Sequence, residues 1–344
     1  SGRIARFFQD SQLTPLIALV AFLLGLFAVA VTPREEEPQI NVTMANVLIP
    51  FPGASARDVE TLVATPAEQV LAQMNGVEHV YSVSRPGMAV LTVQFKVGVP
   101  RIDALVRLYD TINSNRDWVS PNLGIGEPII KPKGIDDVPI VALTLWSENP
   151  ATGAYELERV AHAAEVELKR VPGTREVQTL GGPGRSVRVL LDADRLAAYG
   201  VSALDLRNAL QLSNVSLPTG RLVRENREIV VETGNYLTSA ADVQGLVVGT
   251  FEGRPVYLSD VAEVVDGPNP PVRYVWMGTA SGDQPAVTIQ VTKKPGENAV
   301  DVAERVVRRL EELRGTVIPH EVRVTVTRDY GATANDKAMK LIQK

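Results

Sequence analysis

Apolar positions recur along most of this chain with the period of a helix or of a strand, and only the N-terminal part departs from both. No charged residue occurs between residues 11 and 33, and Leu13–Val31 is almost wholly apolar. Its 19 residues at a rise of about 1.5 Å each come close to the hydrocarbon thickness of a bilayer, about 30 Å. The pattern therefore predicts one transmembrane helix, and residues 1–34 are assigned to it and to a cytoplasmic N-terminus.

The charges on either side of this run predict its orientation. Arg3 and Arg6 precede it, whereas Arg34 is followed at once by Glu35–Glu37. The positive-inside rule then places the N-terminus in the cytoplasm and the chain after Thr32 outside. A cleavable signal peptide is the alternative, because Ala-Val-Ala at residues 28–30 resembles a cleavage site. The apolar cores of signal peptides are shorter, however, at about 7–15 residues, which favours a retained helix.

Residues 35–134 predict one α+β unit with the element order β-α-β-β-α-β. This order is that of the split βαβ, or ferredoxin-like, motif. Pro66 lies inside the first helical stripe and predicts a kink there. The predicted strands are Ile40–Ile49, His79–Ser84, Ala89–Lys96 and Pro128–Lys131, and the predicted helices run from Ser55 to Met74 and over Ile102–Ile112.

The same pattern returns later in the chain, which indicates a duplication. Gly76 and its neighbours correspond to Gly173 and its neighbours, an offset of 97 (173 − 76). Further along, Gln94 corresponds to Gln290, an offset of 196 (290 − 94). The register therefore shifts by 99 residues (196 − 97). We infer that one unit was duplicated and that a second module was inserted into the later copy.

The second unit is assigned to residues 135–184 and 284–330, and the insertion to residues 185–283. A turn at residues 217–220 is predicted within the insertion, and the segment between Asn214 and Glu228 is expected to be compact. The elements predicted for the second unit are Val138–Trp146, Tyr155–Arg170, Val177–Leu180, Ala286–Thr292, Ala299–Leu313 and Val322–Thr327. Those predicted for the insertion are Val187–Leu191, Arg195–Tyr199, Leu204–Gln211, Glu228–Thr233, Val247–Thr250 and Pro255–Leu258.

The C-terminal residues 331–344 predict the start of a second transmembrane helix that stops early. The chain also lacks an initiator Met and begins with Ser1-Gly2. We therefore expect it to be a fragment of a longer protein.

Composition and motifs argue against nucleic-acid binding, metal binding and catalysis. The hydrophobic fraction of 45% and the charged fraction of 22% are those of a globular protein. A net charge of −5 with no basic cluster argues against a nucleic-acid partner. There is no cysteine, and the three histidines lie far apart with no metal-ligand spacing. No nucleophile or phosphate-binding motif occurs. We expect no enzyme activity, no cofactor and no metal site.

Three segments together resemble a known family. Residues 50–60 (PFPGASARDVE) are similar to a [YF]-P-G-A-S-A-x-x-V-E segment, Met74–Val77 to M-N-G-[VI], and Val171–Gln178 to the matching turn of the second unit. In order and spacing they resemble the N-terminal half of the resistance-nodulation-division (RND) efflux permeases, hydrophobe/amphiphile branch. The resemblance covers about Leu13–Lys344.

This resemblance implies a fold and a function. The two ferredoxin-like units would be porter subdomains, and the insertion a docking subdomain. The protein would be part of a homotrimeric, proton-driven exporter of amphipathic compounds in the bacterial inner membrane, with most of this chain in the periplasm. Its partners would be a periplasmic adaptor protein, an outer-membrane channel and the lipid bilayer. The proton-relay residues of the family lie on later helices, outside this chain.

The resemblance also implies a substrate path between the two duplicated sheets. It would be lined by Val138, Ile140, Leu180, Val272 and Tyr274. Leu180 stands where the family has an aromatic residue, so we expect a more aliphatic pocket. The longer arm of known drug pumps is missing from the compact segment expected before Glu228, which implies different trimer contacts.

Two other functions remain open at this point. One is an RND metal-ion exporter, against which the few, scattered methionines argue. The other is a membrane-anchored periplasmic binding or adaptor module, although the long helical hairpin typical of adaptors is not predicted here.

Overall fold

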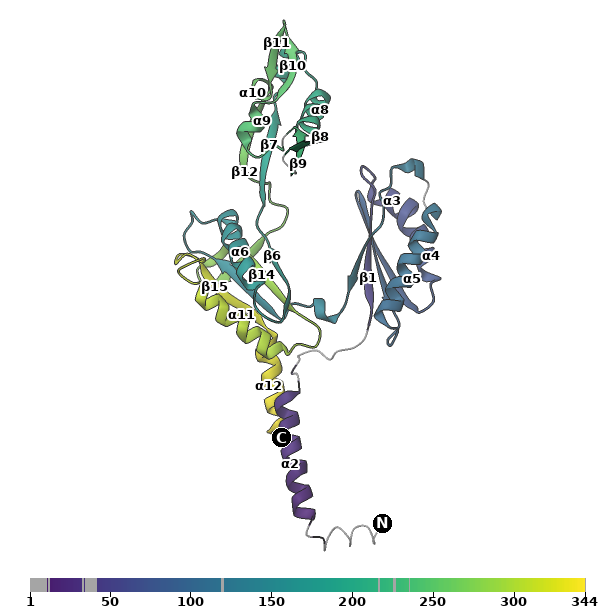
Figure 1. The fold of residues 1–344 in the computed structure, drawn as a ribbon, viewed down its shortest axis with the longest axis vertical. Coiled ribbons are helices and arrows are strands. Elements are labelled where there is room, and N and C mark those ends of the chain that lie inside the picture. The colour runs from purple at the N-terminus through teal and green to yellow at the C-terminus, as the bar shows by residue number, and fades with distance from the viewer. Residues whose placement is uncertain are drawn as a thin grey trace.

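The computed structural model describes residues 11, 13–32, 34, 42–118, 121–215, 217–224, 227–234 and 236–343. They form an α+β structure with several antiparallel sheets. Two sheet-and-helix units lie side by side above a stem formed by helices α2 (Thr14–Val31) and α12 (Tyr330–Ile342), and a smaller module stands on one unit (Figure 1). In the first unit the helices lie on the side away from the second unit (Figure 1).

The first unit is a four-stranded antiparallel sheet with the order β2-β3-β1-β4. Its strands are β1 (Met44–Pro50), β2 (Val77–Arg85), β3 (Met88–Phe95) and β4 (Ile129–Lys133). Alternate residues of β1 and β3 are fully buried against the helices, as expected where one face of a sheet is covered. The predicted order β-α-β-β-α-β is therefore confirmed for this unit.

The first helix of this unit contains a π-helical turn where a kink is predicted. It consists of α3 (Ala56–Val59), the π turn η1 (Glu60–Ala64) and α4 (Thr65–Ala72). The Thr65 N–H donates to the Glu60 carbonyl, five residues back. Pro66 has no N–H to donate and its ring crowds the preceding turn, so a widened turn accommodates it at the start of α4. The second helix is α5 (Arg101–Ser114).

The second unit repeats this architecture. Its sheet has the order β13-β14-β5-β15, and β6 pairs along part of β14. Helices α6 (Ala154–Leu168) and α11 (Ala299–Leu313) bury apolar residues in its core. The strands are β5 (Val141–Trp146), β6 (Thr174–Leu180), β13 (Val275–Thr279), β14 (Gly282–Lys293) and β15 (Arg323–Asp329).

The correspondence between the two copies extends to single hydrogen bonds. Lys96 N–H donates to the Gly76 carbonyl at 2.9 Å, and Lys294 N–H donates to the Gly173 carbonyl at the same distance. Both glycines have a left-handed backbone, with φ of +89° and +90°. The repeat seen in the sequence thus produces the same turn in both units. Strand β13 was not predicted.

The loop between the two units is held by ion pairs to the second unit. The short 3₁₀ turn η4 (Ile135–Asp137) follows β4. Asp137 pairs with Arg175, and Asp136 lies 3.5 Å from the buried Nζ of Lys293. This acidic pair is therefore bound to β6 and β14.

The inserted module stands on a two-stranded ribbon made of β7 (Arg185–Leu191) and β12 (Ala262–Pro268). It has a small core of its own, to which Leu206, Val256 and Leu258 contribute. Strand β12 was not predicted. The other elements are α7 (Ala193–Tyr199), α8 (Ala203–Ser213), α9 (Ala240–Gln244), β10 (Val247–Phe251), β11 (Arg254–Tyr257) and α10 (Leu258–Val261).

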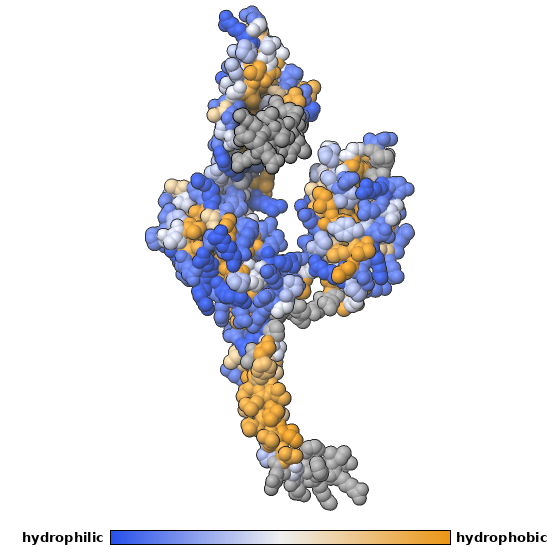
Figure 2. All heavy atoms as spheres, in the orientation of Figure 1, coloured by the Kyte–Doolittle hydropathy of each residue, from blue (hydrophilic) through white to orange (hydrophobic). Residues whose placement is uncertain are grey.

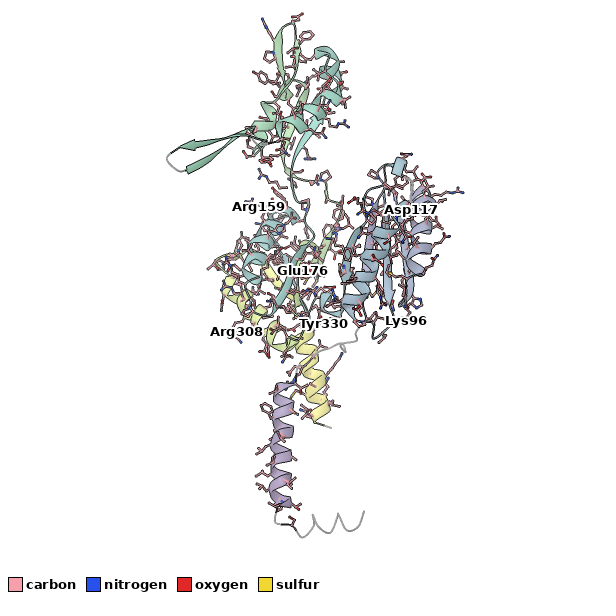
Figure 3. All side chains as sticks on the ribbon, turned by 45° about the vertical axis from the view of Figure 1, so that its right-hand side comes forward. Lys96, Asp117, Arg159, Glu176, Arg308 and Tyr330 are labelled. Atoms are coloured by element: carbon pink, nitrogen blue, oxygen red, sulfur yellow. The ribbon has the colours of Figure 1, made fainter. Side chains whose placement is uncertain are left out.

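One prediction for the module is wrong. Instead of a turn at residues 217–220 and a compact segment, the chain forms a hairpin of β8 (Leu217–Arg224) and β9 (Arg227–Thr233). The hairpin projects from the module in Figure 3. Its pairing register shifts between Pro218 and Gly220, so the two residues that suggested a turn lie at an irregularity within a strand, where they are tolerated.

The stem helix α2 matches the predicted apolar run, but the predicted membrane span is not confirmed. Within the described part of the chain, no helix combines the length and the hydropathy that a membrane crossing requires. Helix α2 has 18 residues, or about 27 Å at 1.5 Å per residue, against a hydrocarbon thickness of about 30 Å. Its apolar side chains are exposed, and Figure 2 shows them along the whole stem.

A helix is present where one is predicted near the end of the chain, as α12, and it packs against α11 of the second unit. Gly331, in the first turn of α12, lies so close to α11 that an added Cβ would be 2.6 Å from Cβ of Ala303. The Arg34 guanidinium also donates to the Asn335 side chain at 2.5 Å. Arg34, three residues beyond the end of α2, is therefore tied to α12.

Candidate functional site

The candidate site is a hollow of about 1060 Å³ at the junction of the second unit and the inserted module. The start of α6, the turn after β6, the foot of the β7–β12 ribbon and strand β13 surround it. Its lining residues are Gly153–Glu156, Arg159, Gly182, Pro183, Arg185, Arg188, Asp266–Pro271, Arg273–Trp276 and Pro285. The volume is just above the range of about 300–1,000 Å³ that is typical of small-molecule sites.

A glycine turn forms one wall because no larger residue fits there. Gly181 and Gly182 have left-handed φ angles of +86° and +80°. A Cβ on Gly181 would lie 2.7 Å from Cγ2 of Val275, and one on Gly182 would lie 2.6–2.8 Å from the Glu158 side chain. Glu158 in turn accepts a hydrogen bond from Gly184 N–H at 2.8 Å. The turn thereby fixes the end of β6 against α6 and β13.

An ion pair closes the foot of the ribbon. Arg185 donates two hydrogen bonds to Asp266, from Nε at 2.8 Å and from Nη2 at 2.6 Å. These bonds hold the pKa of the Asp266 carboxyl below its ordinary value. Asn269 N–H donates to the Gly184 carbonyl at 2.9 Å, so the departing and returning chains pair at this point. The ion pair and this hydrogen bond together hold the two strands of the ribbon against each other where the module begins.

Three further arginines line the hollow: Arg159 on α6, Arg188 on β7 and Arg273 in the return to β13. Among the described residues, none of the three has a carboxylate partner. Nε of Arg188 is buried and, within that same part of the chain, has no hydrogen-bond acceptor. Figure 3 shows Arg159 on the side of the second unit that faces the module.

Apolar and aromatic side chains complete the wall. Tyr274 and Trp276 are 65% and 56% exposed. Trp276 pairs with Pro285 across β13 and β14, and Pro270 and Pro271 stiffen the adjoining segment. The hollow can therefore receive both a negative charge and an aromatic or aliphatic body.

The five residues predicted to line a substrate path lie in different places. Tyr274 lines the hollow, and Leu180 ends β6 immediately before the glycine turn. Val272 is 90% exposed between the proline-rich return and Tyr274. Ile140 is buried in the core of the second unit, and Val138 is half-buried just after η4.

The arginines and Trp276 were not identified from the sequence. No motif in the sequence links the prolines at residues 268, 270 and 271 or the glycines at residues 181, 182 and 184 to Arg159 or Arg188. In the described ranges, no group of three or more His, Asp or Glu residues is suited to hold a metal ion.

Comparisons with known proteins agree with one another. A family model described as the AcrB/AcrD/AcrF family matches residues 4–339. The multidrug resistance protein MdtC of Proteus mirabilis (strain HI4320) is 29% identical over 330 residues, which is 96% of this chain and 31% of that protein. The chain thus spans about a third of the length of this relative.

Proposed function

Because the chain belongs to the AcrB/AcrD/AcrF family of RND transporters, we propose that it is the N-terminal part of an inner-membrane efflux transporter driven by the proton-motive force. The family is one of transporters and not of enzymes, in agreement with the prediction from the sequence. The proposed cargo is hydrophobic and amphipathic compounds, exported through a tripartite complex. The observation that carries the proposal is the family match over residues 4–339 in a single continuous order.

The parts of the chain have separate roles in this proposal. Residues 35–134 form one porter subdomain, and residues 135–184 with 284–330 form another. Residues 185–283 form the docking subdomain, with hairpin β8–β9 as a contact to a neighbouring subunit of a trimer. Residues 1–34 hold the chain at the inner membrane with the N-terminus on the cytoplasmic side, and residues 331–344 return to it. The exposed apolar surface of α2 supports contact with lipid.

The proposed partners are a second and third copy of the chain, a periplasmic adaptor protein and an outer-membrane channel. The position of the module, at the end of the molecule opposite to α2, supports this arrangement (Figure 1). In this proposal the docking subdomain lies far from the membrane that α2 would contact, on the side where an outer-membrane channel would lie.

Substrate recognition is proposed to involve Val138, Ile140, Leu180, Val272 and Tyr274. The best supported of them are Leu180 and Tyr274, because one precedes the glycine turn of the hollow and the other lines it. Ile140 is buried at 6% exposure and contributes through the shape of the second unit.

The experiment is a resistance profile. The full-length gene is expressed in a strain that lacks its own efflux pumps, and growth inhibition by a set of neutral, anionic and cationic amphiphiles is measured. We expect resistance from the unaltered gene, and a changed profile from Leu180→Ala and Tyr274→Ala at equal protein level. Loss of resistance to every compound, in proportion to reduced protein, would show that the two residues only support the fold. No resistance from the unaltered gene would contradict the transport proposal.

A further inference from the structure

The hollow at the base of the module carries an uncompensated positive charge. Four arginines line it, against the two carboxylates of Glu156 and Asp266. Asp266 is occupied by Arg185, and Glu156 accepts the Gly153 N–H at 3.0 Å as part of the cap of α6. The charges of Arg159, Arg188 and Arg273 remain without a carboxylate among the described residues.

Arg188 is held in a state that favours binding of an anion. It lines the hollow from β7, and its Nε is buried without an acceptor in the part of the chain that the structure describes. A cation that is partly removed from water and has no counter-charge interacts more strongly with an incoming anion than a fully hydrated one does. The planar fork of a guanidinium group can also donate two parallel hydrogen bonds to two oxygens of a carboxylate or of a sulfonate.

The remaining wall determines what the anion is attached to. Tyr274 and Trp276 present exposed aromatic rings, and prolines 270, 271 and 285 add rigid apolar surface. A simple inorganic anion would leave this apolar surface exposed to water. An aromatic or polycyclic acid would bury it and neutralise the arginines at the same time.

We infer that this hollow binds anionic amphiphiles, with the acid group against Arg188, Arg159 and Arg273 and the apolar body against Tyr274 and Trp276. The role of such binding in export rests on the proposed function, whereas the binding itself does not. The site would give the transporter a preference for acids over cations of the same shape.

The test uses the whole chain in detergent, labelled with 5-fluorotryptophan. Its three tryptophans give separate ¹⁹F resonances, of which only that of Trp276 reports on the hollow. The probes are naphthalene-2-sulfonate and 2-naphthyltrimethylammonium, which share one ring system and differ in charge. We expect the sulfonate to shift the Trp276 resonance saturably, and the cation to bind at least about tenfold more weakly.

Variants distinguish a specific binding site from nonspecific electrostatic attraction of the anion. Arg273→Gln, at an exposed position, and Arg188→Met should each weaken sulfonate binding by about tenfold or more. Arg308→Gln is the matched control, because Arg308 is an exposed arginine on α11 at the opposite end of the same unit (Figure 3). It should leave binding unchanged. Arg273→Gln keeps the test valid if Arg188→Met fails to fold.

Three results would overturn the inference: equal shifts with the anionic and cationic probes, unchanged binding by Arg273→Gln, or a response only at Trp118 or Trp146. Binding of dihexanoyl phosphatidylglycerol as tight as that of the sulfonate would also overturn it, in favour of a lipid headgroup site. In the full-length transporter, Arg273→Gln should reduce resistance to acids and spare that to cations. A transporter that exports nothing would refute the proposed function and leave the binding result intact.

Discussion

The two copies of the duplicated unit provide a matched pair of glycines whose substitution should have unequal effects. Gly76 and Gly173 occupy the same turn, with φ of +89° and +90° and the same hydrogen bond from a lysine N–H. An alanine at either position must adopt a left-handed backbone, which costs about 1–2 kcal/mol. This part of the destabilisation is common to both.

The surroundings of the added methyl group differ. At Gly76 its nearest atom would be Nη1 of Arg107 at 3.3 Å, the far end of a flexible side chain. At Gly173 it would lie 2.8 Å from Cγ2 of Val302, a fully buried residue of α11, and 3.1 Å from Glu297 Oε2. Val302 can move only by disturbing the core, and overpacking of this kind costs about 1–3 kcal/mol. Gly173→Ala should therefore lower the free energy of unfolding by about 1–3 kcal/mol more than Gly76→Ala does.

Native-state hydrogen exchange measured by mass spectrometry can resolve the two units. Peptides from β1 and β3 report on the first unit, and peptides from β5 and β14 report on the second. A difference of about 1–3 kcal/mol corresponds to about 5- to 150-fold in the opening constant. In each variant the unaltered unit serves as the internal control. Equal losses of protection in the two variants, or a larger loss from Gly76→Ala, would refute the steric argument.

Two further outcomes are expected. Leu143→Ala, at a fully buried position of β5, should destabilise the second unit by about 2–5 kcal/mol. The control Ile102→Ala, at a position of α5 that is 76% exposed, should change stability by no more than about 0.5 kcal/mol. Urea unfolding checks both variants, and similar unfolding midpoints would contradict the burial argument. Because hydrogen bonds from Arg185 lower the pKa of Asp266 in the folded state, their stabilising effect is complete above the unfolded value of about 3.9 and is lost as the pH falls through the folded value. In the unaltered chain, the protection factors of β7 and β12 amides should thus be constant from about pH 5 to 8 and should decrease when the pH is lowered below about 4. In Asp266→Asn this decrease at low pH should be absent. A change in the protection factors between about pH 5 and 8 would contradict the prediction.

Local patterns in the sequence determined most of the elements. The apolar stripe of Ala299–Leu313 became α11 with the predicted bounds, and the strand predicted at Ala89–Lys96 became β3 at Met88–Phe95. The repeat of the Gly76 turn at Gly173 was also visible, because a left-handed turn strongly favours glycine. These features depend on residues close to each other in the chain, and short-range periodicity records them.

Tertiary structure decided the features in which distant segments meet. Pairing of β12 with β7 joins residues about eighty positions apart, and no local pattern specifies such a partner. The hairpin β8–β9 was missed because Pro218 and Gly220, which usually mark turns, are tolerated at a register shift. The hollow has the same origin: Arg159, Arg188 and Arg273 each occur on a different element, and only the fold brings their charges to one wall. An isolated arginine in a sequence is typical of a solvated surface. Only the packing of the described structure shows whether a carboxylate lies beside it, and therefore whether its charge is paired.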